Sequence, residues 1–252
     1  MSEQKTRQLE VKTGIKASAE QVWRAVSEGE ELQRWFAPVA KVEPGQGGSV
    51  FISWGAGMEF TSRITIWEPN RHLRTEGEPR SKGDSKEMCS LAVDYFIEAG
   101  DGETVLRVVT SGFGAGAEWD GEYDGTENGW RAFLKVLKCA IERHPGKVAA
   151  QTSFTVKTLL TRDECWGRIA AALGFAGLKA GDRLTLHGVT GAVENAATHE
   201  FVMTAESLDD GYVWLTMIPG AAWANVITFE FDQAKLDAFV AELKAAIAAA
   251  LG

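Results

Sequence analysis

The sequence predicts an α+β protein of two tandem modules, in each of which a curved antiparallel sheet surrounds a long C-terminal helix. Three observations predict this fold class. β-rich segments separated by turn residues fill the middle of each half, and one long amphipathic helix closes each half. The opening and closing segments of the first half also recur, in the same order, in the second. We place the first module at residues 1–146 and a shorter, degenerate copy of it at residues 147–252.

A short strand followed by a helix start opens each half. The letters VKT at 11–13 precede Ser18-Ala19-Glu20-Gln21, and VKT at 156–158 precede Thr161-Arg162-Asp163-Glu164. Ser or Thr followed three residues later by Gln or Glu is the capping-box pattern, in which each side chain bonds the backbone N–H of the other residue. We therefore expect one helix to begin at Ala19 and another directly after Thr161.

The segments that close the two halves are more similar still. Residues 132–141 read AFLKVLKCAI, and residues 238–247 read AFVAELKAAI. One such match can arise by chance between amphipathic helices, but two matches in the same order favour duplication. Pro145 and Gly146 stop the first long helix and set the boundary between modules. The apolar positions fall at the spacing of one helical face: Phe133, Leu134, Leu137, Ala140 and Ile141.

The middle of each half reads as a sheet. Leu91, Val93, Tyr95 and Ile97 alternate with small or polar residues, which predicts a strand with one apolar face. A sheet of this kind followed by an amphipathic helix predicts a sheet wrapped around that helix. We expect strands at 49–54, 58–67, 73–76, 90–98 and 104–110, with turns at 55–57, 69–70 and 100–102. In the second half we expect strands at 183–187, 198–207, 212–218 and 226–231, then a helix at 233–251.

Composition and charge exclude several classes of protein. The chain has 252 residues, 45% of them hydrophobic, and a formal net charge of −9. Lys and Arg form no basic stripe, which argues against nucleic acid and anionic membrane surfaces as partners. No apolar run approaches the roughly 20 residues that span a bilayer, and residues 1–10 lack the apolar core of a signal peptide. We expect a cytoplasmic protein without a membrane span.

The reactive side chains form no recognisable catalytic or metal-binding motif. Cys89, Cys139 and Cys165 are far apart, so neither a disulfide framework nor a zinc site is indicated. The four histidines lack metal-ligand spacing. Residues 112–117 read GFGAGA, but a loop rather than the helix of a dinucleotide site is expected to follow. We therefore expect no metal, no cofactor and no catalytic residue.

The segment before the long helix reads as a glycine-rich loop. Asp120, Glu122, Asp124 and Glu127 form an acidic group there, and we expect these carboxylates to be solvated rather than paired for acid–base chemistry. Asp124 or Thr126 is placed to cap the helix that follows. We hypothesise that residues 113–119 form a lid over a cavity.

Several segments of the first half resemble a known family. They read IKASAEQVWRA at 15–25, LQRWFAP at 32–38, PGQGGSVF at 44–51, WEPNRHL at 67–73, TSGF at 110–113 and GWRAFL at 129–134. Their order resembles the SRPBCC, or START-like, superfamily, and within it the homologues of the activator of heat-shock-protein-90 ATPase. The resemblance covers about residues 9–143. It implies a helix-grip fold with a cavity between sheet and C-terminal helix, where members of the superfamily bind apolar molecules. It implies no shared catalytic residues.

The aromatic residues are the candidates for a binding site. One helix cannot fill a strongly curved sheet, so a void or a ligand is expected between them. Strand and helix periodicity points Phe60, Tyr95, Trp130 and Phe133 into that space, and Trp35 is expected to close one end. The expected ligand-binding residues are Trp35, Phe60, Ile64, Val93, Tyr95, Val108, Trp119, Trp130, Phe133 and Leu137.

Three functions compete at this point. The first is non-catalytic binding of a small apolar ligand by the first module. The second is a protein-interaction module, such as a chaperone ATPase regulator. The third is an enzyme that uses a pocket carboxylate or Tyr95, which nothing specific in the sequence supports. We expect a monomer or homodimer, and little cavity in the shortened second module.

Overall fold

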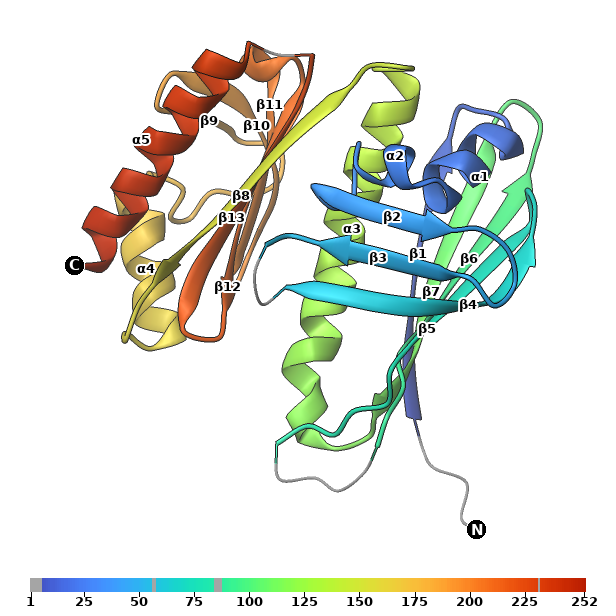
Figure 1. The fold of residues 1–252 in the computed structure, drawn as a ribbon. Helices are drawn as coiled ribbons and strands as arrows, with labels where there is room; N and C mark the ends of the chain where they lie inside the picture. The colour runs from blue at the N-terminus through green and yellow to red at the C-terminus, as the bar shows by residue number, and fades with distance from the viewer. Residues whose placement is uncertain (1–5, 56–57, 84–87, 231) are drawn as a thin grey trace. The chain divides into compact units, whose positions relative to one another are not determined.

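The computed structural model describes residues 6–55, 58–83, 88–230 and 232–252. The chain divides into two compact units, Met1–Gly146 and Lys147–Gly252, and each is described here by itself (Figure 1). The turn expected at 55–57 and the end of the strand expected at 226–231 lie partly outside the described residues.

The first unit is one seven-stranded antiparallel sheet with helices between its strands and after its last strand. The strands follow the order β1-β7-β6-β5-β4-β3-β2, so the first strand of the unit pairs with the last. The elements in chain order are β1 (Thr6–Ile15), α1 (Ala19–Ser27), α2 (Gly29–Leu32), β2 (Val39–Glu43), β3 (Ser49–Ser53), β4 (Glu59–Glu68), β5 (His72–Gly77), β6 (Ala92–Ala99), β7 (Thr104–Gly114), the 3-10 turn η1 (Ala117–Trp119) and α3 (Asp120–Glu142).

The register of the ladder shows which side chains share the inner face of this sheet. Ile64 lies opposite Thr75, Thr75 opposite Val93, and Val93 opposite Thr110. Directly paired residues point to the same face of a sheet. The helix α3 runs along this face (Figure 1), and Trp130 Nε1 donates to Thr110 Oγ1 across 2.9 Å. The expected arrangement of a long helix across a sheet is confirmed.

The start of α3 differs from the loop expected there. β7 continues to Gly114 and α3 begins at Asp120, so most of residues 113–125 belongs to regular elements. Arg7 on β1 forms an ion pair with Asp120 at 2.6 Å, and Tyr123 Oη donates to the carbonyl of Gln8 at 2.9 Å. These contacts with β1 outweigh the low helix propensity of the glycines in this segment. The predicted loop was wrong.

The second unit is a six-stranded antiparallel sheet with two helices on one face. The strand order is β8-β13-β12-β11-β10-β9, so the first strand again pairs with the last. The elements are β8 (Ala149–Lys157), α4 (Arg162–Ala172), β9 (Arg183–Leu186), β10 (Val189–Ala197), β11 (Glu200–Ala205), the 3-10 turn η2 (Glu206–Leu208), β12 (Gly211–Ile218), β13 (Ala221–Phe229) and α5 (Gln233–Leu251).

The core of the second unit lies between its sheet and its helices. Phe201 and Met203 on β11 are fully buried, as are Leu236 and Leu243 on α5. Cys165 and Ile169 bring α4 into the same cluster. Strand, helix, antiparallel meander and C-terminal helix therefore follow one another as in the first unit, with one strand fewer.

Both expected helix starts are confirmed. Ser18 Oγ accepts from the backbone N–H of Gln21 at 3.2 Å, while the Gln21 side chain accepts from the Ser18 backbone at 2.9 Å. Thr161 and Glu164 form the same pair of bonds at the start of α4.

In the described part of the chain, no helix has both the length and the apolar character needed to cross a membrane.

Candidate ligand-binding site

Seven aromatic side chains gather at the concave side of the first sheet, and we call them the aromatic cluster. Phe36 is central: its ring stacks on Trp130 at 5.4 Å between centroids and meets Trp54 edge-on at 5.2 Å. Trp130 reaches Tyr95 at 5.7 Å, and Trp54 reaches Phe60 at 6.3 Å. The members are Trp35, Phe36, Trp54, Phe60, Tyr95, Trp130 and Phe133.

Five parts of the fold supply these rings. Trp130 and Phe133 lie three residues apart on α3 and so share one helix face. Trp35 and Phe36 follow α2, Trp54 follows β3, Phe60 begins β4 and Tyr95 lies in β6. The cluster therefore joins the long helix, the sheet and the segment after α2.

Hydrogen bonds fix the three indole rings in place. Trp35 Nε1 donates to the carbonyl of Ala25 at 2.8 Å, and Trp54 Nε1 donates to that of Phe36 at 3.0 Å. Trp130 Nε1 donates to Thr110, as described above. Because each indole N–H has a partner inside the protein, the aromatic faces are held in one orientation before any ligand arrives.

The cluster leads from the interior to the surface. Tyr95 is only 6% exposed, whereas Phe60 is 54% exposed. Phe36 and Trp54, which connect them through Trp130, are partly buried. Phe60 is therefore the member of the cluster that an apolar molecule can contact at the surface.

The hydroxyl of Tyr95 lacks a partner at the inner end of the cluster. No hydrogen bond among the described residues reaches it. Burial raises the pKa of Tyr95 well above its ordinary value, so the phenol is neutral near pH 7. A polar group on a ligand could form a hydrogen bond with this hydroxyl, which can donate or accept.

Most of the residues expected in the site lie near one another. Trp35, Phe60, Tyr95, Trp130 and Phe133 belong to the aromatic cluster. Their neighbours on the inner face of the sheet and on α3 are Ile64, Val93, Val108 and Leu137.

The structure does not bring Trp119 to this cluster. Its ring is fully buried beside Phe113, 6.5 Å away, and beneath the cationic groups of Arg80 and Lys82. A side chain at Gly114 would collide with its indole, so this glycine allows the close approach. Phe113, Gly114 and Trp119 are therefore packed into the unit away from the aromatic cluster, which does not support the hypothesis of a lid at residues 113–119.

Arg80 and Lys82 also bind the carboxylate of Glu122, in the first turn of α3. Lys82 Nζ lies 2.9 Å from Glu122 Oε2, and Arg80 pairs with Oε1. Partial burial acts to raise the pKa of Glu122, but the bonds from Arg80 and Lys82 outweigh it and hold that pKa below its ordinary value. Glu122 was expected to be solvated, and it is instead paired.

Sequence reasoning missed Phe36, Trp54 and Thr110. Phe36 lies outside the expected strands and helices, and Trp54, the last residue of the strand expected at 49–54, follows β3 in the structure. Thr110 is polar and was not considered for an apolar site. It accepts the hydrogen bond from Trp130 because its pairing with Val93 turns its side chain towards α3. A count of aromatic residues near Trp35 could have found Phe36.

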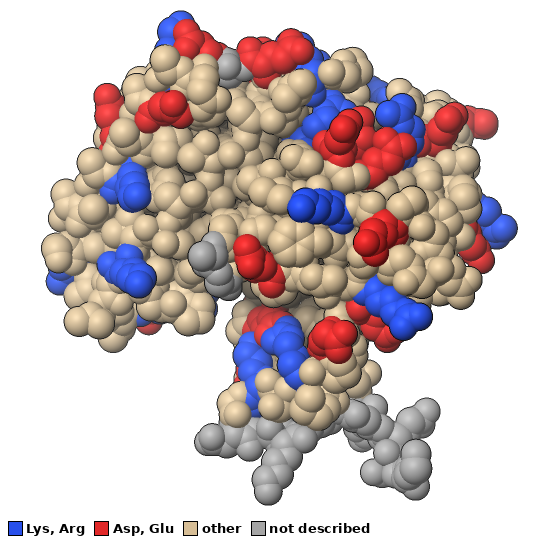
Figure 2. Space-filling view, in the orientation of Figure 1, with Lys and Arg blue, Asp and Glu red and all other residues tan. Residues whose placement is uncertain are grey.

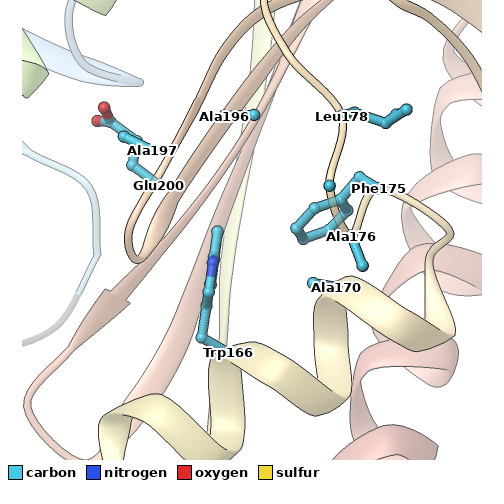
Figure 3. Close-up of a pocket in the computed structure, with 9 residues that line it drawn as sticks. Trp166, Ala170, Phe175, Ala176, Leu178, Ala196, Ala197 and Glu200 are labelled. Atoms are coloured by element: carbon cyan, nitrogen blue, oxygen red, sulfur yellow. The ribbon is translucent and has the colours of Figure 1, made fainter.

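The second unit contains a pocket of its own. Its volume is about 270 Å³, and Trp166, Phe175 and Leu178 contribute its larger apolar walls (Figure 3). Four of its lining residues, Ala176, Gly177, Ala196 and Ala197, are exposed, so it is a hollow open to the surface and not an enclosed cavity between sheet and helix.

Charged or metal-binding side chains would be the further candidates for a site among the described residues. On the face in Figure 2, cationic and anionic side chains are interspersed without a continuous basic stripe among the described residues. Within the described ranges, no three His, Cys, Asp or Glu side chains are grouped so as to hold a metal ion.

The fold and the site define a class of protein. A seven-stranded antiparallel sheet with a long helix against its aromatic-rich inner face is a START-like helix-grip module, and the expected α+β fold class is confirmed. The model of the family described as "Activator of Hsp90 ATPase homolog 1-like protein" matches residues 16–142, half of the chain. The chain belongs to this family, as the sequence motifs predicted. No curated protein matches the sequence.

Solved structures are similar in fold. Protein MLL2253 from Mesorhizobium loti is 22% identical with a TM-score of 0.48, over 55% of this chain and 98% of that one. The Aha1 dimer from Colwellia psychrerythraea is 20% identical with a TM-score of 0.46, over 56% and 99%. The di-domain ARO/CYC BexL from the BE-7585A biosynthetic pathway is 15% identical with a TM-score of 0.48, over 97% and 93%.

Proposed function

We propose that the first unit binds a small hydrophobic ligand at the aromatic cluster and does so without catalysis. The observation that carries the proposal is the continuous series of ring contacts from the exposed Phe60 to Tyr95, which is only 6% exposed and whose hydroxyl forms no hydrogen bond among the described residues. Apolar sites of this kind usually combine many hydrophobic contacts with a few polar groups that orient the ligand. Here Tyr95 supplies such a polar group.

The chemistry of the cluster favours a flat, largely apolar molecule. Within the cluster Phe36 and Trp130 are parallel while Tyr95 and Trp130 are nearly perpendicular, and a flat ligand could add a further ring contact of either kind at Phe60. Burial of apolar ligand surface contributes about 25 cal/mol per Å². A hydroxyl or carbonyl at the inner end of the ligand would bond Tyr95, which is neutral and can donate or accept.

Paired probes test this proposal. The full chain is titrated with naphthalene and with 2-naphthol, and binding is followed by tryptophan fluorescence. We expect Phe60→Ala to weaken binding of both probes about fivefold or more, because each 1.4 kcal/mol of lost contact is a factor of ten. We expect Tyr95→Phe to weaken only 2-naphthol.

The control is Val39→Ala. Val39 is also an exposed apolar residue, at 43%, but it pairs with Ser53 and so points to the opposite face from Phe60. It should leave both affinities unchanged. Absence of binding by either probe, or equal affinity in the Phe60→Ala and unaltered chains, would contradict the proposal.

The family description favours a second function. Its name refers to activation of the Hsp90 ATPase, so the alternative is a protein-interaction module that regulates a chaperone ATPase. This alternative predicts that the purified chain raises the ATPase rate of an Hsp90-type chaperone. An unchanged rate, in a preparation that still binds 2-naphthol, would favour the ligand-binding function.

A further inference from the structure

The pocket of the second unit lies away from the long C-terminal helix of that unit. The nine described residues that line it come from α4, from the segment after α4, and from β10 and β11. They are Trp166, Ala170, Phe175, Ala176, Gly177, Leu178, Ala196, Ala197 and Glu200.

The amino-acid sequence explains why this space is empty. Five of the nine lining residues are Ala or Gly, which carry at most one side-chain carbon. They line the pocket from three directions, namely α4, the segment at 176–177 and the end of β10. Ala176, Gly177, Ala196 and Ala197 are exposed, so these small residues leave a hollow open to the surface, which the larger side chains frame without filling (Figure 3).

The two aromatic rings of the pocket wall, Trp166 and Phe175, pack against other rings of the second unit. Phe175 is buried and stacks on Phe201, with centroids 4.3 Å apart and ring planes within 18°. Trp166 contacts Phe175 at 5.3 Å and the ring of His199 at 6.3 Å. His199 is itself bonded to Asp163 at 2.6 Å. The walls are therefore formed before a ligand enters, which lowers the entropy lost on binding.

The charge of the lining favours a neutral ligand. Glu200 is the one charged residue among the nine, and its side chain accepts a hydrogen bond from Asn195 Nδ2 at 2.5 Å. Figure 3 shows the carboxylate directed away from the rings of Trp166 and Phe175. The rings and the alanine methyl groups give the pocket its apolar part, while the rest of its wall is polar.

We propose that the second unit carries its own site, at this pocket, for a small, neutral, planar aromatic molecule the size of indole. The volume of about 270 Å³ lies just below the 300–1,000 Å³ of sites for drug-sized ligands, so it suits one or two fused rings and excludes a sterol or a long acyl chain. This inference goes beyond the proposed function, which concerns the first unit.

Alanine methyl groups provide a readout that is specific to this pocket. The full chain is prepared with carbon-13 in its alanine methyls, and the signals of Ala196 and Ala197 are assigned from the Ala196→Gly and Ala197→Gly variants. Indole is then titrated. We expect both methyl signals to shift in a saturable manner, because an aromatic ring placed against a methyl group changes its chemical shift.

A blocking variant and a matched control complete the test. Ala176→Leu places a larger side chain at the lining, whereas Ala180→Leu makes the same change at an exposed alanine of the same segment that does not line the pocket. We expect Ala176→Leu to weaken binding about tenfold or more, a loss of 1.4 kcal/mol, and Ala180→Leu to leave it unchanged. Saturable shifts that persist in Ala176→Leu, or no shifts in the unaltered chain, would overturn the proposal.

The two proposed sites can fail separately. Phe60→Ala alters the aromatic cluster of the first unit and should leave the Ala196 and Ala197 shifts unchanged. Loss of these shifts in Phe60→Ala would show that they do not report on the pocket, and would also overturn this inference.

Discussion

Trp130 on α3 and Thr110 on β7 form a buried hydrogen bond, with 2.9 Å between Nε1 and Oγ1. This bond joins the long helix to the sheet beside the aromatic cluster. It also fixes the ring against which Phe36 stacks and which Tyr95 meets edge-on. The geometry of the candidate site therefore depends on a polar pair within an otherwise apolar interface.

The losses of unfolding free energy caused by changing Thr110 and Trp130 should be less than additive. Thr110→Val leaves the indole N–H of Trp130 buried and unpaired, which costs about 1–3 kcal/mol of unfolding free energy. In the double variant with Trp130→Phe, no N–H is left unpaired, so the second change should cost less than it does alone. Urea denaturation of the four chains measures this coupling. Strictly additive losses would show that the bond contributes no specific stability.

Tyr95→Phe should not destabilise the protein. The hydroxyl forms no hydrogen bond among the described residues, so the change to phenylalanine removes no bond from the folded chain. We expect the free energy of unfolding to stay constant or to rise by about 1 kcal/mol. Chemical denaturation is the measurement. A loss larger than about 1 kcal/mol, the typical worth of one hydrogen bond, would reveal a bonded hydroxyl.

The same residue should make the protein sensitive to alkali. Burial raises the pKa of Tyr95 in the folded state above the value of about 10 expected in the unfolded chain. As the pH rises through about 10, the unfolded chain loses the Tyr95 proton while the folded chain keeps it. Deprotonation therefore favours the unfolded chain, and the free energy of unfolding falls above that pH. Unfolding free energy should therefore fall more steeply between about pH 9 and pH 11 in the unaltered chain than in Tyr95→Phe. Equal slopes would contradict this.

Glu122 should confer the opposite dependence, at acid pH. Its folded-state pKa is lowered despite partial burial, because Arg80 and Lys82 bind the carboxylate. The stabilisation is present above the ordinary pKa and is lost as the pH falls through the lowered one. Glu122→Gln should therefore be less stable than the unaltered chain near neutral pH, with the difference shrinking towards about pH 3. Asp124→Asn, an exposed acid in the next helical turn, is the control.

The two capping boxes should each contribute measurable stability. Ser18→Ala and Thr161→Ala remove the side-chain oxygen that accepts from the first turn of α1 or α4, at a cost of about 1 kcal/mol each. Ser18→Thr and Thr161→Ser keep an oxygen and should be nearly neutral. Thermal and urea unfolding would show the difference. Alanine variants as stable as the hydroxyl variants would mean that the caps are replaced by solvent.

Features encoded by nearby residues were predictable from the sequence. The capping boxes at Ser18 and Thr161 need only four consecutive residues, and α5 begins and ends where expected, at Gln233 and Leu251. The inner-face positions of Val93, Tyr95 and Val108 follow from strand alternation, and the ladder register agrees with them. Helix starts and the inward-facing strand positions can therefore be predicted from capping residues and from the alternation of apolar side chains along a few consecutive residues.

Features that depend on distant contacts were not predictable. The first turns of α3 contain Gly121 and Gly125 and read as a loop, yet contacts between Arg7 and Asp120 hold them in a helix. The small and polar residues of β10, at 189–197, have low strand propensity and form a strand between two partners. Trp119 fits a site by composition, but the close approach at Gly114 directs it elsewhere.

In each unit the first strand is paired with the last, as Val11 with Val108 and Val156 with Ala222 show. A nascent chain leaving the ribosome must therefore carry an unpartnered leading strand until nearly its whole module has been synthesised. Contacts between such distant segments slow folding, and an open edge invites mispairing with other chains. Translation that stalls before β7 or β13 would release a fragment whose opening strand has no native neighbour to shield it.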